Sequence, residues 1–370
     1  MLKLNYFLAD IFILSAEKQP IKLSWRKIEC LRMREHKIIT CTGYGATGSS
    51  VITDLLKEFK TVHSLGDFEF SIAHEVDGIS DLQHYIVDDF HRNKVTEGIY
   101  RFKKLVRNLN KYYAPFFHDK FLLYADEYVD SLIDVKWNGF WHQHLIRCSP
   151  LVRYTKYSLP NLLQIYVNKY FRKNTGYEFV PKMRTQEMCV SYGAGKFFEQ
   201  TKRFYNLLFD AVDVKGEYEY LALDQLVPSY NYERYLKYFS NIKVIVIDRD
   251  PRDLYLLNKL YWHDGWIPSE DINTFIKWFS LIRRHQICEK SSLSQVLKIR
   301  FEDCIFKYEE TLQQILTFLE MPQELHIRQR EFFNPDVSKK NVALWKKHPQ
   351  YDADIKLIEE QLSEFCYGFS

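Results

Sequence analysis

The chain has 370 residues, which is long enough to bury a full core in one large domain or in two closely joined ones. Its composition, with 46% apolar and 27% charged residues, is that of a folded soluble protein and argues against extensive disorder. Lys and Arg number 51 against 48 Asp and Glu, and the net charge of +3 gives no support to nucleic-acid binding through bulk phosphate attraction. Any anion site must therefore be local, and we expect no nucleic-acid partner.

Cysteine usage and the N-terminal segment bear on the compartment. The seven cysteines are scattered and form no C-x-x-C pair, a pattern that suits a reducing compartment and argues against both a disulfide framework and a zinc site. An apolar run over residues 6–14 is interrupted by Asp10 and is too short to span a bilayer. We therefore expect a cytoplasmic protein with no integral membrane segment and no bound metal.

The most informative stretch begins at Lys37, where a β-rich run leads into a glycine-containing loop and then into apolar residues at helical spacing. The glycines are Gly43, Gly45 and Gly48, and the helical positions are Val51, Leu55 and Phe59. Such a loop folds tightly around an anion, and the first amides of the following helix point at that anion with the positive end of the helix dipole. Ser49 and Ser50 add hydroxyl donors. The stretch predicts an anion site, and its alternative interpretation is an ordinary strand-to-helix turn.

The same stretch is close to the nucleotide-binding pattern G-x-x-x-x-G-K-[ST], with Gly43 and Gly48 as the two glycines. Ser49 stands where that pattern has its lysine. Because that lysine reaches the terminal phosphates, its loss argues against ordinary ATP or GTP hydrolysis.

The rest of the chain predicts one α/β domain. Apolar patterns indicate a second strand at 61–65 ending in 66–70, helices near 88–113, 196–212 and 308–319, a strand at 296–303 and a closing helix from 355 to 365. No repeats or Pro/Ser-rich linkers divide the chain. We expect an N-terminal extension over 1–34 and a domain over 35–370. Its central, mostly parallel sheet has helices on both faces and a helical insertion at about 81–214.

A second motif follows the run Ile242–Ile247, whose β-branched residues without alternation are typical of a strand buried on both faces. Arg249 and Arg252 follow it, on either side of Pro251. An arginine at such a strand end can hold a phosphate bidentately, and Asp253 can cap the next helix. The alternative is an ordinary turn with an Arg/Asp salt bridge.

Two further clusters are ambiguous. The segment Lys136–His144 holds two tryptophans and two histidines, which suit an acceptor pocket, a metal site or simple packing. Packing is favoured because no further metal ligands are evident. Lys339 and Lys340 precede Trp345 in a basic segment that suits either a lid over an anionic ligand or a solvated loop.

Taken together, these motifs resemble those of the sulfotransferases that use 3′-phosphoadenosine 5′-phosphosulfate (PAPS), and the resemblance implies a P-loop-like fold. The matching segments are Thr47-Gly48-Ser49-Ser50 for the phosphosulfate loop, Arg249-Asp250-Pro251-Arg252-Asp253 for the 3′-phosphate motif, Arg300-Phe301-Glu302-Asp303 with Phe318-Leu319, and Lys339-Lys340 with Trp345. The resemblance implies PAPS as donor and adenosine 3′,5′-bisphosphate (PAP) as product. The cofactor-binding residues that it implies are Gly45, Ala46, Thr47, Gly48, Ser49, Ser50, Arg249, Asn258, Lys339 and Lys340.

Two positions depart from the family pattern. Ala46 stands where the family has a catalytic Lys or Arg, so one contact to the bridging oxygen is missing. Lys182 and Arg184 are candidates to replace it. Leu257 stands where a phosphate-binding serine is expected, and Asn258 beside it is the candidate substitute.

The resemblance also implies a reaction. A base must take the acceptor's proton while the sulfuryl group is transferred, and Glu69 resembles the glutamate of carbohydrate sulfotransferases. His63 and His74 are weaker candidates. We expect a sulfotransferase acting on a hydroxyl or amine of a small-molecule or saccharide acceptor, such as a saccharide or glycolipid precursor. A P-loop nucleotide or small-molecule kinase and a degenerate, non-catalytic nucleotide-binding protein stay open as alternatives.

Overall fold

The computed structural model describes residues 34–141, 143–173, 175–180, 185–192, 195–287 and 293–368. The proposed extension up to residue 33 lies outside the described residues, as do His142, Lys182 and Arg184.

The centre of the molecule is a five-stranded sheet in the order β2-β5-β1-β6-β7, and every strand pairing in it is parallel. The strands are β1 (Lys37–Gly43), β2 (Val62–Glu69), β5 (Tyr220–Asp224), β6 (Ile242–Asp248) and β7 (Val296–Arg300). Most residues of the inner strands β1, β5 and β6 are buried, and β5 and β6 are nearly continuous apolar runs, as expected for strands that have helices on both faces. The predicted α/β class with a mostly parallel sheet is confirmed.

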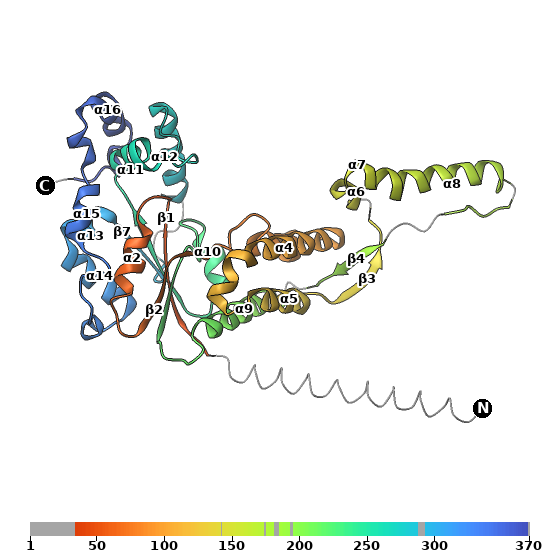
Figure 1. Ribbon diagram of the computed structural model, residues 1–370, viewed down its shortest axis with the longest axis horizontal. Helices are drawn as coiled ribbons and strands as arrows, with labels where there is room; N and C mark the ends of the chain where they lie inside the picture. Colours follow the sequence, from red (N-terminus) through yellow and green to blue (C-terminus); the bar gives the residue numbers. More distant parts are fainter. Residues whose placement is uncertain are drawn as a thin grey trace.

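Alternate residues of the inner strands contribute to two separate cores. Ile38 and Val244 join a cluster with α4 (Arg92–Tyr113), α5 (Phe121–Leu132) and α9 (Phe197–Val212). Ile39 and Ile245 join a second cluster with α2 (Ser49–Leu56), α13 (Phe301–Phe306) and α14 (Tyr308–Leu319). Figure 1 shows these two helix groups on opposite sides of the sheet.

A third apolar cluster lies beside the end of β6. It joins α11 (Pro251–Leu257), α12 (Ile272–Ile287) and α16 (Asp352–Gln361). Shorter helices are α3 (Ile79–Gln83), α10 (Tyr232–Tyr235) and α15 (Pro335–Ser338), the last followed by a 3-10 turn over Lys339–Asn341.

One predicted boundary is wrong. The strand expected over 296–303 ends at Arg300, and Phe301 to Asp303 form the first turn of α13. Glu302 and Asp303 are favourable at a helix N-terminus because their charge complements the helix dipole. Phe301 is buried in the core at the same point.

An arm projects from the body between α5 and α9 (Figure 1). Its stem is the antiparallel pair β3 (Val135–Gly139) and β4 (Gln186–Val190), and its far end carries α6 (His144–Arg147), α7 (Pro150–Arg153) and α8 (Leu159–Tyr170). The Trp/His segment lies in this arm, far from the sheet. None of the helices that the structure describes combines the length and the apolar character needed to cross a membrane.

Candidate functional site

The loop between β1 and α2 has a tightly folded backbone. Gly45, Ala46 and Gly48 all have positive φ values, of 86°, 54° and 99°. A Cβ atom on Gly45 would lie 1.6 Å from the ring of Trp266, and one on Gly48 would lie 2.7 Å from the ring of Phe301. Both positions therefore require glycine, for the backbone angle and for the close approach of an aromatic ring.

Helix α2 begins at this loop without a side-chain cap on its N-terminus. Its first residues, Ser49 and Ser50, line a cavity of about 640 Å³ together with Gly48. Uncapped backbone amides and two hydroxyl groups at a helix N-terminus form an anion-binding arrangement.

Arg249 forms part of the wall of the same cavity. It is 2% exposed, and its guanidinium carbon lies 4.1 Å from the centre of the Phe301 ring and 5.7 Å from that of Trp262. Its Nη2 donates to the carbonyl oxygen of Asn341 at 2.5 Å, whereas its buried Nε has no partner in the structure. Burial lowers the pKa of Arg249 to about 10. No carboxylate of the described residues lies within ion-pair distance of it.

The neighbouring charged residues have structural partners instead. Arg252 pairs with Asp250 and with Glu359, each at 2.6 Å. Its guanidinium is therefore less available than that of Arg249 to bind an anionic ligand. The helix cap is Asp250, whose side chain accepts from the amide of Arg252 at 2.8 Å, and not Asp253 as predicted. Asp253 accepts from the amides of Ala343 and Leu344, each at 2.8 Å, and thereby holds the C-terminal segment against α11.

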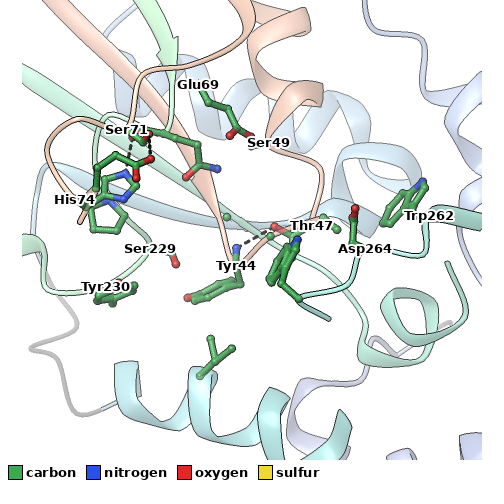
Figure 2. Close-up of a pocket in the computed structure, with 18 of the residues that line it drawn as sticks. Tyr44, Thr47, Ser49, Glu69, Ser71, His74, Ser229, Tyr230, Trp262 and Asp264 are labelled. Carbon is green, nitrogen blue, oxygen red and sulfur yellow. Dashed lines mark hydrogen bonds between the residues drawn. The ribbon is translucent and has the colours of Figure 1, made fainter. Parts of the chain in front are cut away.

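A second, larger cavity of about 1220 Å³ is lined in part by the same loop, from Gly43 to Thr47 (Figure 2). Its lining includes Tyr44, Ser71, His74, Tyr230 and Trp266. Four residues line both cavities, namely Ala46, Ser49, Glu69 and Trp262. We call the cavity with Arg249 the donor cavity and the larger one the acceptor cavity, after the roles that the motif resemblance in the sequence would give them. A group bound at the loop would therefore face both spaces.

Glu69 lies at this junction. It is the last residue of β2, it is exposed, and it is in register with Asp224 at the end of β5. In Figure 2 its carboxylate projects toward Ser49. The parallel sheet accounts for this placement, because the C-terminal ends of parallel strands meet at one edge.

Asp224 was missed by the sequence analysis. It is 3% exposed, its Oδ2 accepts from the Ser49 hydroxyl at 3.0 Å, and its buried Oδ1 has no partner. Burial raises the pKa of Asp224 to about 7, and the charge of Glu69 adds to this effect. The available signal was the short apolar run Tyr220–Leu223, which ends in a carboxylate as a strand leading to a site would.

The two histidines are placed differently. His74 lines the acceptor cavity, and its Nε2 lies 2.8 Å from the carbonyl oxygen of Gln225, so that Nε2 carries the proton. Burial lowers the pKa of His74, which favours the neutral ring. His63 is the second residue of β2, at the end of the strand away from the loop, and it lines neither cavity.

Three of the residues that we expected to bind the cofactor do not line either cavity. The Asn258 amide donates to the carbonyl oxygen of Ile267 at 3.0 Å and to the Ser269 hydroxyl at 2.7 Å, and it accepts from the Asp264 amide. Lys339 is exposed and pairs with Asp336, and Lys340 is exposed as well. The geometry gives no support to a contact between these side chains and a ligand.

Other residues near those positions do line the donor cavity. Ser338 and Asn341, on either side of the two lysines, belong to its wall. Leu257, at the position of the expected serine, is buried in the third apolar cluster. Within the described part of the chain, no group of three His, Cys, Asp or Glu side chains could hold a metal ion.

The model of the sulfotransferase family matches residues 39–324 of the chain. Among solved structures, the sulfotransferase domain of the Synechococcus PCC 7002 olefin synthase is similar at 12% identity with a TM-score of 0.36, covering 84% of this chain and 89% of that one. A Mycobacterium tuberculosis H37Rv sulfotransferase is similar at 11% identity with a TM-score of 0.32, covering 87% and 80%. Retinol dehydratase in complex with androsterone and inactive cofactor PAP is similar at 11% identity with a TM-score of 0.33, covering 91% and 84%. No curated protein sequence matches the chain. The match to the family model spans most of the chain, including the loop after β1 and the strand ends that line the two cavities. The chain therefore belongs to the sulfotransferase family.

Proposed function

We propose that this sulfotransferase takes its sulfuryl group from PAPS and passes it to a hydroxyl or amine of a small-molecule or saccharide acceptor. The observation that carries the proposal is Arg249, a buried cation in the wall of the donor cavity whose Nε has no hydrogen-bond partner. It forms no ion pair with the described residues, and Asp253, Glu302 and Asp250 act on it only from beyond ion-pair distance. Burying a guanidinium without a direct ion pair is costly. A phosphate of the ligand would compensate it through bidentate hydrogen bonds.

The donor cavity and the loop beside it offer groups that suit the two ends of PAPS. The loop from Gly45 to Ser50 and the first amides of α2 would hold the 5′-phosphosulfate, and Arg249 would hold the 3′-phosphate. Ala46, Gly48, Ser49 and Ser50 line the donor cavity, whereas Gly45 and Thr47 line only the acceptor cavity. These roles are proposals for Gly45, Ala46, Thr47, Gly48, Ser49 and Ser50. We do not extend them to Asn258, Lys339 or Lys340, because their side chains line neither cavity.

The proposed reaction is an in-line transfer across the wall that the two cavities share. The bond between sulfur and the phosphate oxygen breaks, a bond between sulfur and the acceptor oxygen or nitrogen forms, and PAP leaves. Glu69 lines both cavities and would accept the acceptor's proton. His74, hydrogen-bonded through Nε2, would orient the acceptor through Nδ1.

The lining of the acceptor cavity supports a hydroxylated acceptor. Tyr44, Tyr230 and Trp266 offer aromatic surfaces, while Ser71 and Glu75 offer polar groups. Flat rings with a few convergent polar groups suit a saccharide or a similar polyhydroxylated molecule. A saccharide or glycolipid precursor therefore remains the proposed acceptor class.

We also keep the cytoplasm as the proposed location. The cysteines that the structure describes are Cys41, Cys148, Cys189, Cys304 and Cys366, and all of them are free thiols. Free thiols are usual in reducing compartments.

Calorimetric titration with PAP, ADP and ATP tests the donor assignment. We expect tight binding of PAP that depends on its 3′-phosphate, and we expect Arg249→Ala to weaken it by at least about 1.5 kcal/mol, the scale of a hydrogen bond to a charged group. Arg284→Ala is the matched control, since Arg284 is exposed on α12. A preference for ATP would favour the kinase alternative. PAP binding without sulfuryl transfer to any acceptor would favour the non-catalytic one.

A further inference from the structure

The helix at the far end of the arm exposes an unusual amount of apolar surface. No residue of α8 is buried. Its large apolar side chains are each at least half exposed, namely Leu159, Leu162, Leu163, Ile165, Tyr166 and Tyr170. A soluble protein rarely leaves a contiguous apolar patch of this kind without a partner.

The orientation of α8 is the reverse of that of an ordinary surface helix. Asn168 faces the returning chain, where its amide accepts from the amide of Phe179 at 2.6 Å and donates to the Phe179 carbonyl at 3.0 Å. Leu159, Leu163 and Tyr166 follow the i, i+4, i+7 spacing on the opposite side of the helix. The polar side of α8 thus contacts the returning chain at Asn168, and Leu159, Leu163 and Tyr166 lie on the side that faces away from it.

The apolar surface continues beyond α8. The exposed side chains on the neighbouring turns are Ile146, Leu151, Tyr154, Phe171, Tyr177 and Val180. Aromatic residues are prominent among them, and tyrosine in particular has an apolar ring with a polar end. Together with the apolar side chains of α8, these residues form what we call the arm face.

The arm is also strongly basic. Between residues 140 and 180 the chain has six Lys or Arg residues and a single acidic residue, Glu178, whereas the whole chain has 51 basic and 48 acidic residues. Five of the six basic residues are exposed and form no ion pair with any residue that the structure describes: Arg153, Lys156, Lys169, Arg172 and Lys173. The segment that forms the arm face therefore carries a local excess of positive over negative charge.

We propose that the arm face docks on an anionic membrane surface, with α8 lying in the interface between headgroups and acyl chains. Aliphatic and tyrosine side chains flanked by Lys and Arg are the composition of helices that lie in this position. Anionic headgroups would neutralise the unpaired cations. Packing two arm faces against each other would instead bring two sets of these cations together without acidic counterparts. This proposal does not depend on the identity of the sulfuryl donor.

Vesicle co-sedimentation of the full chain tests this docking. We expect binding to vesicles of phosphatidylcholine mixed with phosphatidylglycerol, weaker binding to phosphatidylcholine alone, and a loss of the difference as salt is raised. The double variant Leu162→Glu with Tyr166→Glu should weaken binding by about tenfold or more, because both side chains belong to the arm face. Leu123→Glu is the matched control, since Leu123 is 55% exposed on α5, in the body of the molecule. Lys169→Glu with Arg172→Glu should remove the preference for anionic vesicles.

Several outcomes would overturn the proposal. One is that the protein binds neither kind of vesicle, and another is that the Leu162/Tyr166 variant and the control bind vesicles equally well. A third is that ultracentrifugation shows a dimer that dissociates in the Leu162/Tyr166 variant. The last result would assign the arm face to a second copy of the chain. PAP affinity, measured on the same samples, reports whether the body is intact and separates a failure of docking from a failure of the donor assignment.

Discussion

The buried carboxylate of Asp224 gives the protein a pH-dependent stability that one substitution should remove. Burial raises its pKa from 3.8 to about 7. At about 1.4 kcal/mol per pKa unit, this shift corresponds to a cost of about 4 kcal/mol for the ionised form in the folded state. Asp224→Asn keeps the shape and the acceptor for the Ser49 hydroxyl, but it has no ionised form.

The sign follows from proton binding. Between pH 4 and pH 7 the folded protein keeps a proton on Asp224 that the unfolded chain has lost, so the free energy of unfolding falls as pH rises through this window. This contribution is fully present below the unfolded pKa of about 4 and is lost above about pH 7. The Asn variant lacks it. Relative to wild type, Asp224→Asn should therefore gain stability as pH rises, by about 4 kcal/mol between pH 4 and pH 8.

Urea unfolding of both proteins over this pH range measures the difference directly. Asp126→Asn is the control, since Asp126 is an exposed residue of α5, and its unfolding free energy should remain close to that of wild type at every pH. If the profiles of wild type and Asp224→Asn run parallel, Asp224 is not held protonated by burial, and the reasoning is refuted.

Three further predictions concern the two cavities. Glu69→Gln should lower the rate of sulfuryl transfer from PAPS by about a hundredfold or more with little change in PAP affinity. The control Asp67→Asn, also in the donor-cavity wall, should leave that rate nearly unchanged. Equal rates for Glu69→Gln and wild type would show that Glu69 is not the base. Glu58 is fully buried and accepts from three backbone amides of the segment 330–333. Glu58→Ala should therefore lower the free energy of unfolding, measured with urea, by about 3 to 5 kcal/mol, and it should weaken PAP binding. Substitution of the exposed Glu360 by Ala should have neither effect. Ala46→Lys adds no backbone strain relative to alanine at φ 54° and should raise the transfer rate by about tenfold; an unchanged rate would show that another cation already acts there.

The sequence alone determined much of the fold because its signals are local. Continuous β-branched residues predict the buried strand β6, and the helical spacing of apolar residues predicts α9 and α14. The glycine loop before α2 and the arginine after β6 were also evident, since both motifs need only neighbouring residues. That the two motifs meet in one cavity follows from the parallel sheet, whose strand ends share one edge.

Only the tertiary structure decided which side chains reach that cavity. The motif resemblance selects Arg249 over Arg252 without a physical reason, and the structure supplies one: Asp250 and Glu359 pair with Arg252, whereas Arg249 lines the cavity. Asn258 is adjacent to the expected position, yet the turn over 264–269 occupies its amide. No sequence motif marks Asp224, because the rise in its pKa results from burial by residues that are distant in the sequence. The reversed orientation of α8 likewise depends on which side the returning chain contacts, and a helical pattern specifies an apolar side without specifying what it faces.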